Sequence, residues 1–294
     1  MIWLGVRRGY LADYVTQLWV RATGRRIRLA DHPWLDGPIG KTLVIGREFF
    51  VEYAKEHGLE VVRNGTRGLI RDFGELSTAG NDLSAVAAPV KHFYERTSEY
   101  ELDAWSEWSG VFKPFGAALA VIFSRRLQQM NVPLSGLDTS EGMTSEIIQL
   151  RDPRSGSVVQ TAWIRELVGT KNIIYAGGYS VCSAPGHASP CVKVVFPLPN
   201  GNAIVIMKAE AHGDGSLSVT SSGDRFGDPG FYLTVHKGDG SASVRYVRTM
   251  RESIHVYDAG AGTVRGDHVL RLWGAQFLRL HYRLRIGATT ARPA

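Results

Sequence analysis

Residues 264–285 read VRGDHVLRLWGAQFLRLHYRLR, and this stretch decides the fold class. From Phe277 to Arg285, apolar side chains alternate with basic ones. The apolar set is Leu278, Leu280, Tyr282 and Leu284, and the basic set is Arg279, His281, Arg283 and Arg285. A period of two is typical of a β-strand that has one face in a core and the other in solvent. The segment therefore predicts a strand with an apolar inner face and a polar outer face.

The same period continues through the second half of the chain, from Gly142 onward. The candidate strands are Thr144–Leu150, Ser157–Arg165, Asn172–Cys182, Cys191–Phe196, Ala203–Glu210, Ser216–Ser221, Phe231–His236, Ser243–Thr249, Ser253–Tyr257, Val264–Trp273 and Phe277–Arg285. The segments between them are rich in Gly, Asn, Asp and Pro, which form tight turns. Strands at this spacing predict a barrel or a sandwich, and the strand faces favour a barrel with an apolar lumen. The expected fold class is mainly β, α+β overall, built on an antiparallel β-barrel.

A helical region, residues 1–141, is expected to precede the barrel, residues 142–294, and to pack on or into it as one integrated domain. Its first helix is indicated by apolar side chains at intervals of three and four. These are Val6, Tyr10, Leu11, Tyr14, Val15, Leu18 and Trp19. We expect this stripe to pack on the barrel, although the arginines of residues 21–28 leave open a helix at a membrane surface. A second helix is expected to end near His57, and an apolar helix is expected over Phe112–Phe123.

The charge distribution limits the classes of partner. The 294 residues carry a net charge of +6, with a pI near 9.4. The net charge is +4 over residues 1–72, −5 over residues 73–150 and +7 over residues 151–294. An acidic middle between basic flanks indicates segments that pair with one another, and it argues against a nucleic-acid partner. No apolar run approaches the ~18 residues of a membrane helix, so a cytoplasmic protein is expected.

The sequence lacks the pattern of a cofactor site. A Gly-Pro-Ile-Gly-Lys-Thr segment ends like a phosphate-binding loop, but Leu35 occupies the position of its first glycine and Pro38 removes an amide. Cys182, His187 and Cys191 lie close together, yet a structural zinc requires four ligands. The alternatives are a disulfide, in an oxidising compartment, or two free thiols at facing strand ends. We expect neither a metal nor a cofactor.

Aromatic and acidic side chains crowd together between His92 and Trp108. Large aromatic rings can raise the pKa of one carboxyl group while another stays ionised, which is what acid–base chemistry requires. Tyr94, Glu101 and Asp103 are the candidates for this role. The competing interpretation is a helix whose aromatic side chains face inward and whose acids are solvated or paired with arginines of the barrel.

Histidines in the last strands are a second source of acid–base groups. His255 and His281 are the candidate general bases, and each would need a carboxylate partner from a neighbouring strand. Asp267 and His268 are adjacent, so they face opposite sides of the sheet unless a bulge intervenes. The competing interpretation is that these histidines are structural or face solvent.

In architecture alone, strands preceded by helices resemble the lipocalin-type barrels. That resemblance implies carriage of a hydrophobic ligand or, in some natural-product pathways, cofactor-free cyclisation. The first hypothesis is a soluble barrel that encloses a lipid, an isoprenoid or a polyketide-like molecule, and a lumen wholly filled by side chains would exclude it. The expected ligand-binding residues are Trp105, Trp108, Phe112, Tyr246 and Tyr282.

Two alternatives belong to other functional classes. One is a cofactor-independent enzyme, a cyclase or isomerase, and it requires that its carboxylates not point to solvent. The other is an accessory protein at a membrane surface, bound through the first helix and its arginines.

Overall fold

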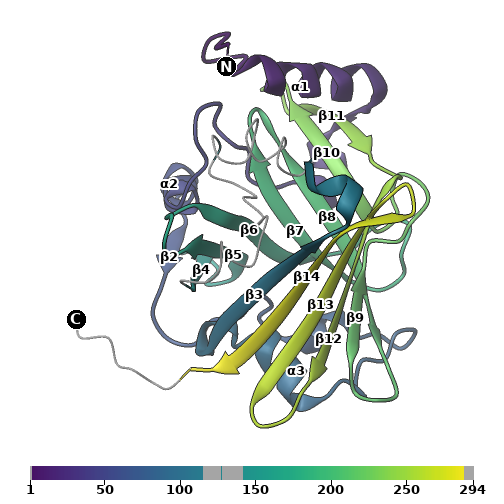
Figure 1. The fold of residues 1–294 in the computed structure, drawn as a ribbon. Helices are drawn as coiled ribbons and strands as arrows, with labels where there is room; N and C mark the ends of the chain where they lie inside the picture. The colour runs from purple at the N-terminus through teal and green to yellow at the C-terminus, as the bar shows by residue number, and fades with distance from the viewer. Residues whose placement is uncertain (1, 115–126, 128–141, 288–294) are drawn as a thin grey trace.

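The computed structural model describes residues 2–114, 127 and 142–287. A 14-stranded sheet, in which all pairs of named strands are antiparallel, dominates the molecule, so the expectation of a mainly β, α+β protein is confirmed (Figure 1). The helices are α1 (Leu11–Thr23), α2 (Phe49–Glu56) and α3 (Ala88–Glu95). Short 3-10 turns occupy Leu29–Asp31, Pro33–Leu35, Phe73–Leu76, Thr97–Glu99 and Gly110–Phe112.

The strands come from both halves of the chain. The first half supplies β1 (Arg25–Arg28), β2 (Glu60–Val62) and β3 (Tyr100–Trp108). The second half supplies β4 (Met143–Arg151), β5 (Val158–Leu167), β6 (Ile173–Cys182), β7 (Cys191–Leu198), β8 (Gly201–Ala211), β9 (Leu217–Thr220), β10 (Gly230–His236), β11 (Ser241–Tyr246), β12 (Met250–Asp258), β13 (Thr263–Leu272) and β14 (Ala275–Ile286). Every candidate strand from Gly142 onward is thus confirmed, with bounds shifted by a few residues.

The sheet curls but stays open. Its hydrogen-bonded order is β2-β4-β5-β6-β7-β8-β9-β12-β13-β14-β3. Strand β3 also contacts β4, so the sheet bends back towards its own beginning (Figure 1). Within the described residues, the end strands β2 and β3 do not pair with each other. A closed barrel is therefore not confirmed, and the observed architecture is a curved antiparallel sheet.

The sheet divides along β8. The first part of this strand pairs with β10, from Gly201 opposite Val235 to Ile206 opposite Gly230, and its last part pairs with β9. Strand β11 then joins β10 to β1. These three strands, β1, β10 and β11, form a wing that carries α1 (Figure 1).

Strand β3 ties the first half of the chain to its last strand. It pairs with β14 from Tyr100 opposite Ile286 to Trp108 opposite Leu278. The helix considered for the aromatic and acidic segment is therefore wrong from Tyr100 to Trp108, although its first residues, His92–Glu95, do lie in α3. The physical reason is a period of two, because Tyr100 and Leu102 are buried whereas Glu101 is exposed.

Three apolar clusters fix the curvature. The largest fills the inside of the curve and includes Phe93 and Tyr94 of α3, the helix that packs against β12 and β13 at one end of the curve (Figure 1). A second joins Trp34 to Tyr232 of the wing. The third holds Phe50 of α2 against the outer side of β4, β5 and β6. This part of the sheet is therefore covered on both faces, and its concave face is directed at the interior.

Helix α1 is confirmed, but the face that packs is not the predicted one. Its buried residues are Asp13, Gln17 and Val20. The apolar stripe is exposed instead, with exposed fractions of 44% for Leu11, 58% for Val15, 52% for Leu18 and 42% for Trp19. Polar contacts explain the orientation, because Gln17 Nε2 donates to Pro199 O and Asn200 Nδ2 donates to Gln17 Oε1, both at 3.2 Å. The apolar face of α1 consequently points away from the wing.

Candidate functional site

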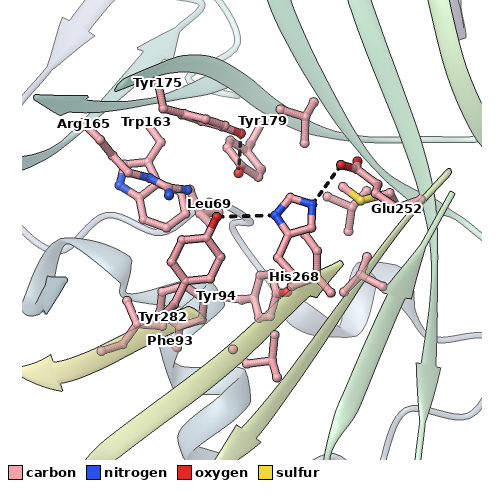
Figure 2. Close-up of a pocket in the computed structure, with 18 of the residues that line it drawn as sticks. Leu69, Phe93, Tyr94, Trp163, Arg165, Tyr175, Tyr179, Glu252, His268 and Tyr282 are labelled. Atoms are coloured by element: carbon pink, nitrogen blue, oxygen red, sulfur yellow. Dashed lines mark hydrogen bonds and ion pairs between the residues drawn. The ribbon is translucent and has the colours of Figure 1, made fainter. Parts of the chain in front are cut away.

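Two adjoining cavities lie inside the curve of the sheet, with volumes of about 80 and 160 Å³. Since ~10–15 Å³ suffices for a water molecule, side chains do not fill this interior. Most of the lining side chains are apolar. The residues that line both cavities are Arg165, Tyr175, Phe196, Glu252, His268 and Tyr282 (Figure 2). These six residues, which we call the partition, place polar groups between two apolar spaces.

The alternation of side chains along the strands places the residues of the partition on one face of the sheet. The apolar face predicted for β14 does line the cavities, through Leu278, Leu280, Tyr282 and Leu284. Residues directly opposite in an antiparallel pair point to the same side of the sheet. His268 of β13 lies opposite Leu280, and Glu252 of β12 lies opposite Leu270, which also lines a cavity. The concave face therefore collects Glu252 and His268 from strands whose sequences show no motif.

Arg165 of β5 is a buried cation in aromatic surroundings. The residue is 6% exposed, and its guanidinium carbon lies 3.8 Å from the ring centroid of Trp163, 4.4 Å from that of Tyr175 and 5.1 Å from that of Tyr282. These are cation–π distances. Its Nε atom has no hydrogen-bond partner, and among the described residues no carboxylate forms an ion pair with it. Buried charges in proteins are normally paired, so this guanidinium is unusual.

A chain of polar contacts crosses the partition beside Arg165 (Figure 2). His268 Nε2 lies 3.0 Å from Glu252 Oε2, and His268 Nδ1 lies 3.4 Å from the hydroxyl of Tyr282. With the proton on Nε2, the ring donates to the carboxylate and accepts from the phenol. Tyr175 and Tyr179 share a further hydrogen bond of 2.6 Å between their hydroxyls. The arrangement can relay a proton between a carboxylate, an imidazole and a phenol.

Burial keeps these phenols protonated. It raises the pKa of Tyr179 to about 12, and it also raises the pKa of Tyr175 and that of Tyr282. At neutral pH their hydroxyls are therefore available as hydrogen-bond donors. Burial lowers the pKa of Arg165, but the neighbouring phenols outweigh this effect and the net direction is upward. The guanidinium accordingly stays charged.

The first group of predicted acid–base residues is divided between inside and outside. Tyr94, on α3, lines the smaller cavity, and burial raises its pKa. Glu101 is exposed on β3. Asp103 accepts hydrogen bonds from Arg283, at 2.7 Å, and from Arg285, at 3.3 Å, on the convex face. Neither carboxylate lines a cavity.

The two predicted histidines also lie on the convex face. His255 Nδ1 is 3.3 Å from Ser218 Oγ, and His281 Nδ1 is 2.6 Å from Asp267 Oδ1. The convex and concave positions alternate along each strand, so the inner acid–base groups are found at the intervening positions of β12 and β13. Sequence reasoning missed Arg165, Glu252 and His268 as cavity residues, and strand parity is the signal that identifies them.

The predicted ligand-binding residues have different surroundings. Tyr282 lines both cavities, and Trp105 borders the larger one while its ring stacks on His281 at 5.2 Å. Trp108 and Phe112 pack on Phe277, at 6.3 and 6.1 Å between ring centroids. Tyr246 belongs to the wing, where its ring lies 5.0 Å from that of Tyr232 and its hydroxyl donates to Gly223 O. The expected helix over Phe112–Phe123 falls mostly outside the described residues.

The two cysteines lie opposite each other where β6 ends and β7 begins. Cys182 pairs in register with Cys191, and both are free thiols. Burial raises the pKa of Cys182 to about 11 and that of Cys191 to about 12, so the thiolate is scarce at neutral pH. His187 lies in the same loop, but in the described part of the chain no three His, Cys, Asp or Glu side chains are grouped to hold a metal.

A basic cleft of about 880 Å³ lies on the outer surface beside α1. Its cationic side chains are Arg7, Arg8, Arg21 and Lys237, and no acidic residue is among the described residues that line it. A concave surface of one charge sign attracts ligands of the opposite sign. The cleft adjoins the helix whose apolar face is exposed, so cationic and apolar groups share one side of the molecule.

Comparison with known proteins gives one relative of note. Over 246 residues, the chain is 29% identical to a Bacillus subtilis (strain 168) protein whose name is "Uncharacterized membrane protein YndJ". The match covers 82% of this chain and 41% of the relative, so the chain corresponds to less than half of that protein. No family model matches the chain, and no solved structure matches it.

The name of the relative bears on location. In the described parts of the chain, none of the helices has the length and apolar character to cross a membrane. The relative is nevertheless named as a membrane protein, so a cytoplasmic location stays a prediction.

Proposed function

We propose that the curved sheet encloses a hydrophobic small molecule, such as a lipid, an isoprenoid or a polyketide-like compound. The observation that carries this proposal is the pair of adjoining cavities, whose lining is mainly Val, Ile, Leu, Met and aromatic side chains. Ligand sites are typically concave and apolar, with a few polar groups that orient the ligand. The partition supplies such groups.

A lipocalin-like closure of the sheet remains part of the proposal. The contact between β3 and β4 brings the curve close to a barrel, and barrels of this kind hold one small ligand in the lumen. Because fold does not fix function, the cavities carry the proposal and the architecture adds an analogy.

Binding of the neutral dye Nile red, followed by its fluorescence, tests the proposal. Gly266 lines the smaller cavity, and a Cβ atom there would meet its nearest neighbour, a ring carbon of Tyr282, at an ordinary 3.4 Å. Gly266→Leu should therefore fold, occupy the cavity and weaken dye binding about tenfold, or ~1.4 kcal/mol. Gly213→Leu is the matched control, since Gly213 is exposed and has open space around it.

The dye experiment has a clear negative outcome. If the wild-type protein does not bind Nile red, or if Gly266→Leu binds it as well as Gly213→Leu does, the cavity is not a hydrophobic ligand site. Native mass spectrometry of the purified protein adds a second readout, because a bound compound would shift the mass and could then be identified.

A cofactor-independent cyclase or isomerase is a second candidate function. It is favoured by the contact chain from Glu252 through His268 to Tyr282 inside an apolar cavity. Glu252 would hold the imidazole in place as a base that removes a proton from a ligand carbon, and Tyr282 would return a proton to another atom of the ligand. One proton leaves and one returns, so the ligand keeps its formula.

Deuterium exchange tests this second function. A compound that copurifies with the protein should gain deuterium when the complex is incubated in D₂O, and Glu252→Gln should slow that gain about 100-fold. A recovered compound without deuterium would leave carriage as the function of the cavity.

Action at a membrane surface is a third candidate, favoured by the exposed stripe of α1. Leu11, Val15, Leu18 and Trp19 form an apolar face beside the basic cleft. A helix with this distribution binds in the plane of an anionic membrane, where each basic residue near the surface adds ~1 kcal/mol. The name of the relative is consistent with this proposal.

Sedimentation with vesicles tests membrane binding. The protein should sediment with phosphatidylglycerol vesicles at low salt and not with phosphatidylcholine vesicles. Leu18→Asp should abolish sedimentation, whereas Val159→Asp should not, because Val159 is similarly exposed, at 50%, but lies on β5. Equal sedimentation of both variants would exclude α1 as the contact.

A further inference from the structure

Arg165 is unusual because the structure surrounds its charge with aromatic rings and gives it no counter-ion. Arginines on the convex face of β14 are paired: Arg279 contacts Asp267 at 3.3 Å and Arg283 contacts Asp103 at 2.7 Å. Within the described residues, the inner arginine lacks such a carboxylate, although it is far more buried than either of them. A cation removed from water without a counter-ion is costly to the fold.

The aromatic rings compensate this charge in part and leave donors free. Rings that lie over the flat faces of a guanidinium attract the charge but accept none of the hydrogen bonds in its plane. Trp163 and Tyr175 are the nearest rings, at 3.8 and 4.4 Å. The Nε–H group is buried and has no acceptor, so not every N–H donor in the plane of the guanidinium has a hydrogen-bond partner within the protein. The guanidinium lies where both cavities meet.

The carboxylate inside the cavities is already engaged. Among the described lining residues, Glu252 is the single acid, and it contacts His268 at 3.0 Å. It does not reach Arg165 as an ion pair. The interior therefore holds one carboxylate that has a hydrogen-bond partner and one guanidinium that lacks a counter-ion. An added anion would supply that counter-ion.

We propose that Arg165 binds the carboxylate of a hydrophobic carboxylic acid, whose apolar body fills the cavities. This inference rests on the proposed function of ligand enclosure and specifies the class of ligand. A guanidinium offers parallel N–H donors that match the two oxygens of a carboxylate.

The number of cations selects a carboxylate over a phosphate. Arg165 is the sole Arg or Lys among the described residues that line the two cavities. One guanidinium neutralises the single charge of a carboxylate, whereas a phosphate monoester carries close to two negative charges at neutral pH. An apolar cavity penalises the charge that is left over.

Displacement of bound Nile red distinguishes the head groups. Dodecanoic acid, 1-dodecanol and dodecyl phosphate have the same chain, so differences among them at pH 8 report on the head group. The acid should displace the dye at a concentration about 10- to 100-fold lower than the alcohol, the usual range for a hydrogen-bonded charge pair. It should also displace the dye more effectively than the phosphate.

Variants connect the preference to Arg165. Arg165→Met should retain Nile red binding and lose the preference for the acid over the alcohol, while Arg165→Lys should keep part of it. Arg283→Met is the matched control, because it removes an arginine from the convex face and should leave the preference intact. If Arg165→Met does not fold, the wild-type comparison of acid and alcohol still decides.

The outcomes separate the two proposals. Failure of the wild-type protein to bind Nile red would refute ligand enclosure itself. Dye binding with equal displacement by acid and alcohol would overturn the role of Arg165 and leave enclosure intact. A stronger effect of dodecyl phosphate than of dodecanoic acid would overturn the assignment of a carboxylate.

Discussion

Gly177 makes room for the aromatic wall of the cavities, and replacing it tests the packing directly. It lies on β6 midway between Tyr175 and Tyr179, on the same face. A Cβ atom at Gly177 would lie 2.8 Å from Cε1 of Tyr175, which is too close for two carbon atoms. Gly177→Ala must therefore displace the Tyr175 ring, whose hydroxyl forms the 2.6 Å bond to Tyr179.

The free energy of unfolding should fall by about 2 kcal/mol. Overpacking of a core typically costs ~1–3 kcal/mol, and loss of a hydrogen bond costs ~0.5–1.5 kcal/mol. Replacement of a strand glycine by alanine returns ~0.5–1 kcal/mol through backbone entropy. The steric and hydrogen-bond terms exceed the entropic gain, so the sign of the change is destabilising.

Urea unfolding followed by tryptophan fluorescence measures this change. Gly266→Ala is the matched control, because its Cβ atom would meet the Tyr282 ring at 3.4 Å and requires no displacement. That variant should be as stable as the wild type or more stable by up to about 1 kcal/mol. In a Tyr175→Leu background, Gly177→Ala should lose most of its cost. Equal stability of the two glycine variants, or an unchanged cost in that background, would refute the steric explanation.

Three further predictions concern titration and packing. Burial raises the pKa of Tyr179 from 10.0 to about 12, so the stability linked to this proton is complete below about pH 10 and is lost as the pH rises towards 12. The urea midpoint should drop as the pH is raised from about 10 to about 12, and Tyr179→Phe should reduce that drop. The pKa of Cys182, about 11 instead of 9.0, should make its reaction with a disulfide reagent at pH 8 about 100-fold slower in the folded than in the urea-unfolded protein. Gln17→Leu should destabilise the protein by ~1–3 kcal/mol in urea unfolding, because it leaves Pro199 O and Asn200 Nδ2 without this partner; an unchanged midpoint would show that these bonds do not fasten α1.

The strands of the second half could be predicted because their signals are local. Alternation and turn residues lie close together in the sequence, and the sheet preserves them. The pattern of β3 is weaker, since Trp105 lies on its exposed side and Ser106 on the side of Leu102. A large aromatic on the convex face and a hydroxyl on the concave one obscure the period. The pairing with β14 that makes this segment a strand joins residues far apart in the chain, such as Asp103 and Arg283, which are 180 positions apart.

The apolar stripe of α1 predicted a helix correctly and its orientation wrongly. A hydrophobic period reports that one face of a helix is apolar, but not what covers that face. Here the packing is decided by Gln17, a polar residue whose partners, Pro199 and Asn200, come from a distant turn. Such contacts depend on the tertiary structure, and no local signal in the sequence announces them.

The match between the inner faces of β13 and β14 depends on one irregularity in their pairing. These strands are joined by a two-residue turn, Trp273 and Gly274, both with positive φ, which sets Leu272 opposite Ala275. Regular pairing from that turn would place His268 opposite Arg279, and it would leave Asp267 on the side of Leu280.

A β-bulge reverses that outcome. The register shifts between Leu270 and Arg271, so that Leu270 pairs with Leu278 and His268 pairs with Leu280. A shift of one residue exchanges the two faces of everything beyond it. The extra residue, Phe277, lies on β14, whereas β12 and β13 pair without a shift. The bulge therefore turns Leu278 and Leu280 to the side of His268, and it turns His281 to the side of Asp267, which it contacts. Strand parity limits the cavity position to one of two adjacent residues, Asp267 or His268, and the regular pairing of His268 with Ile254 of β12, which lines the smaller cavity, selects His268.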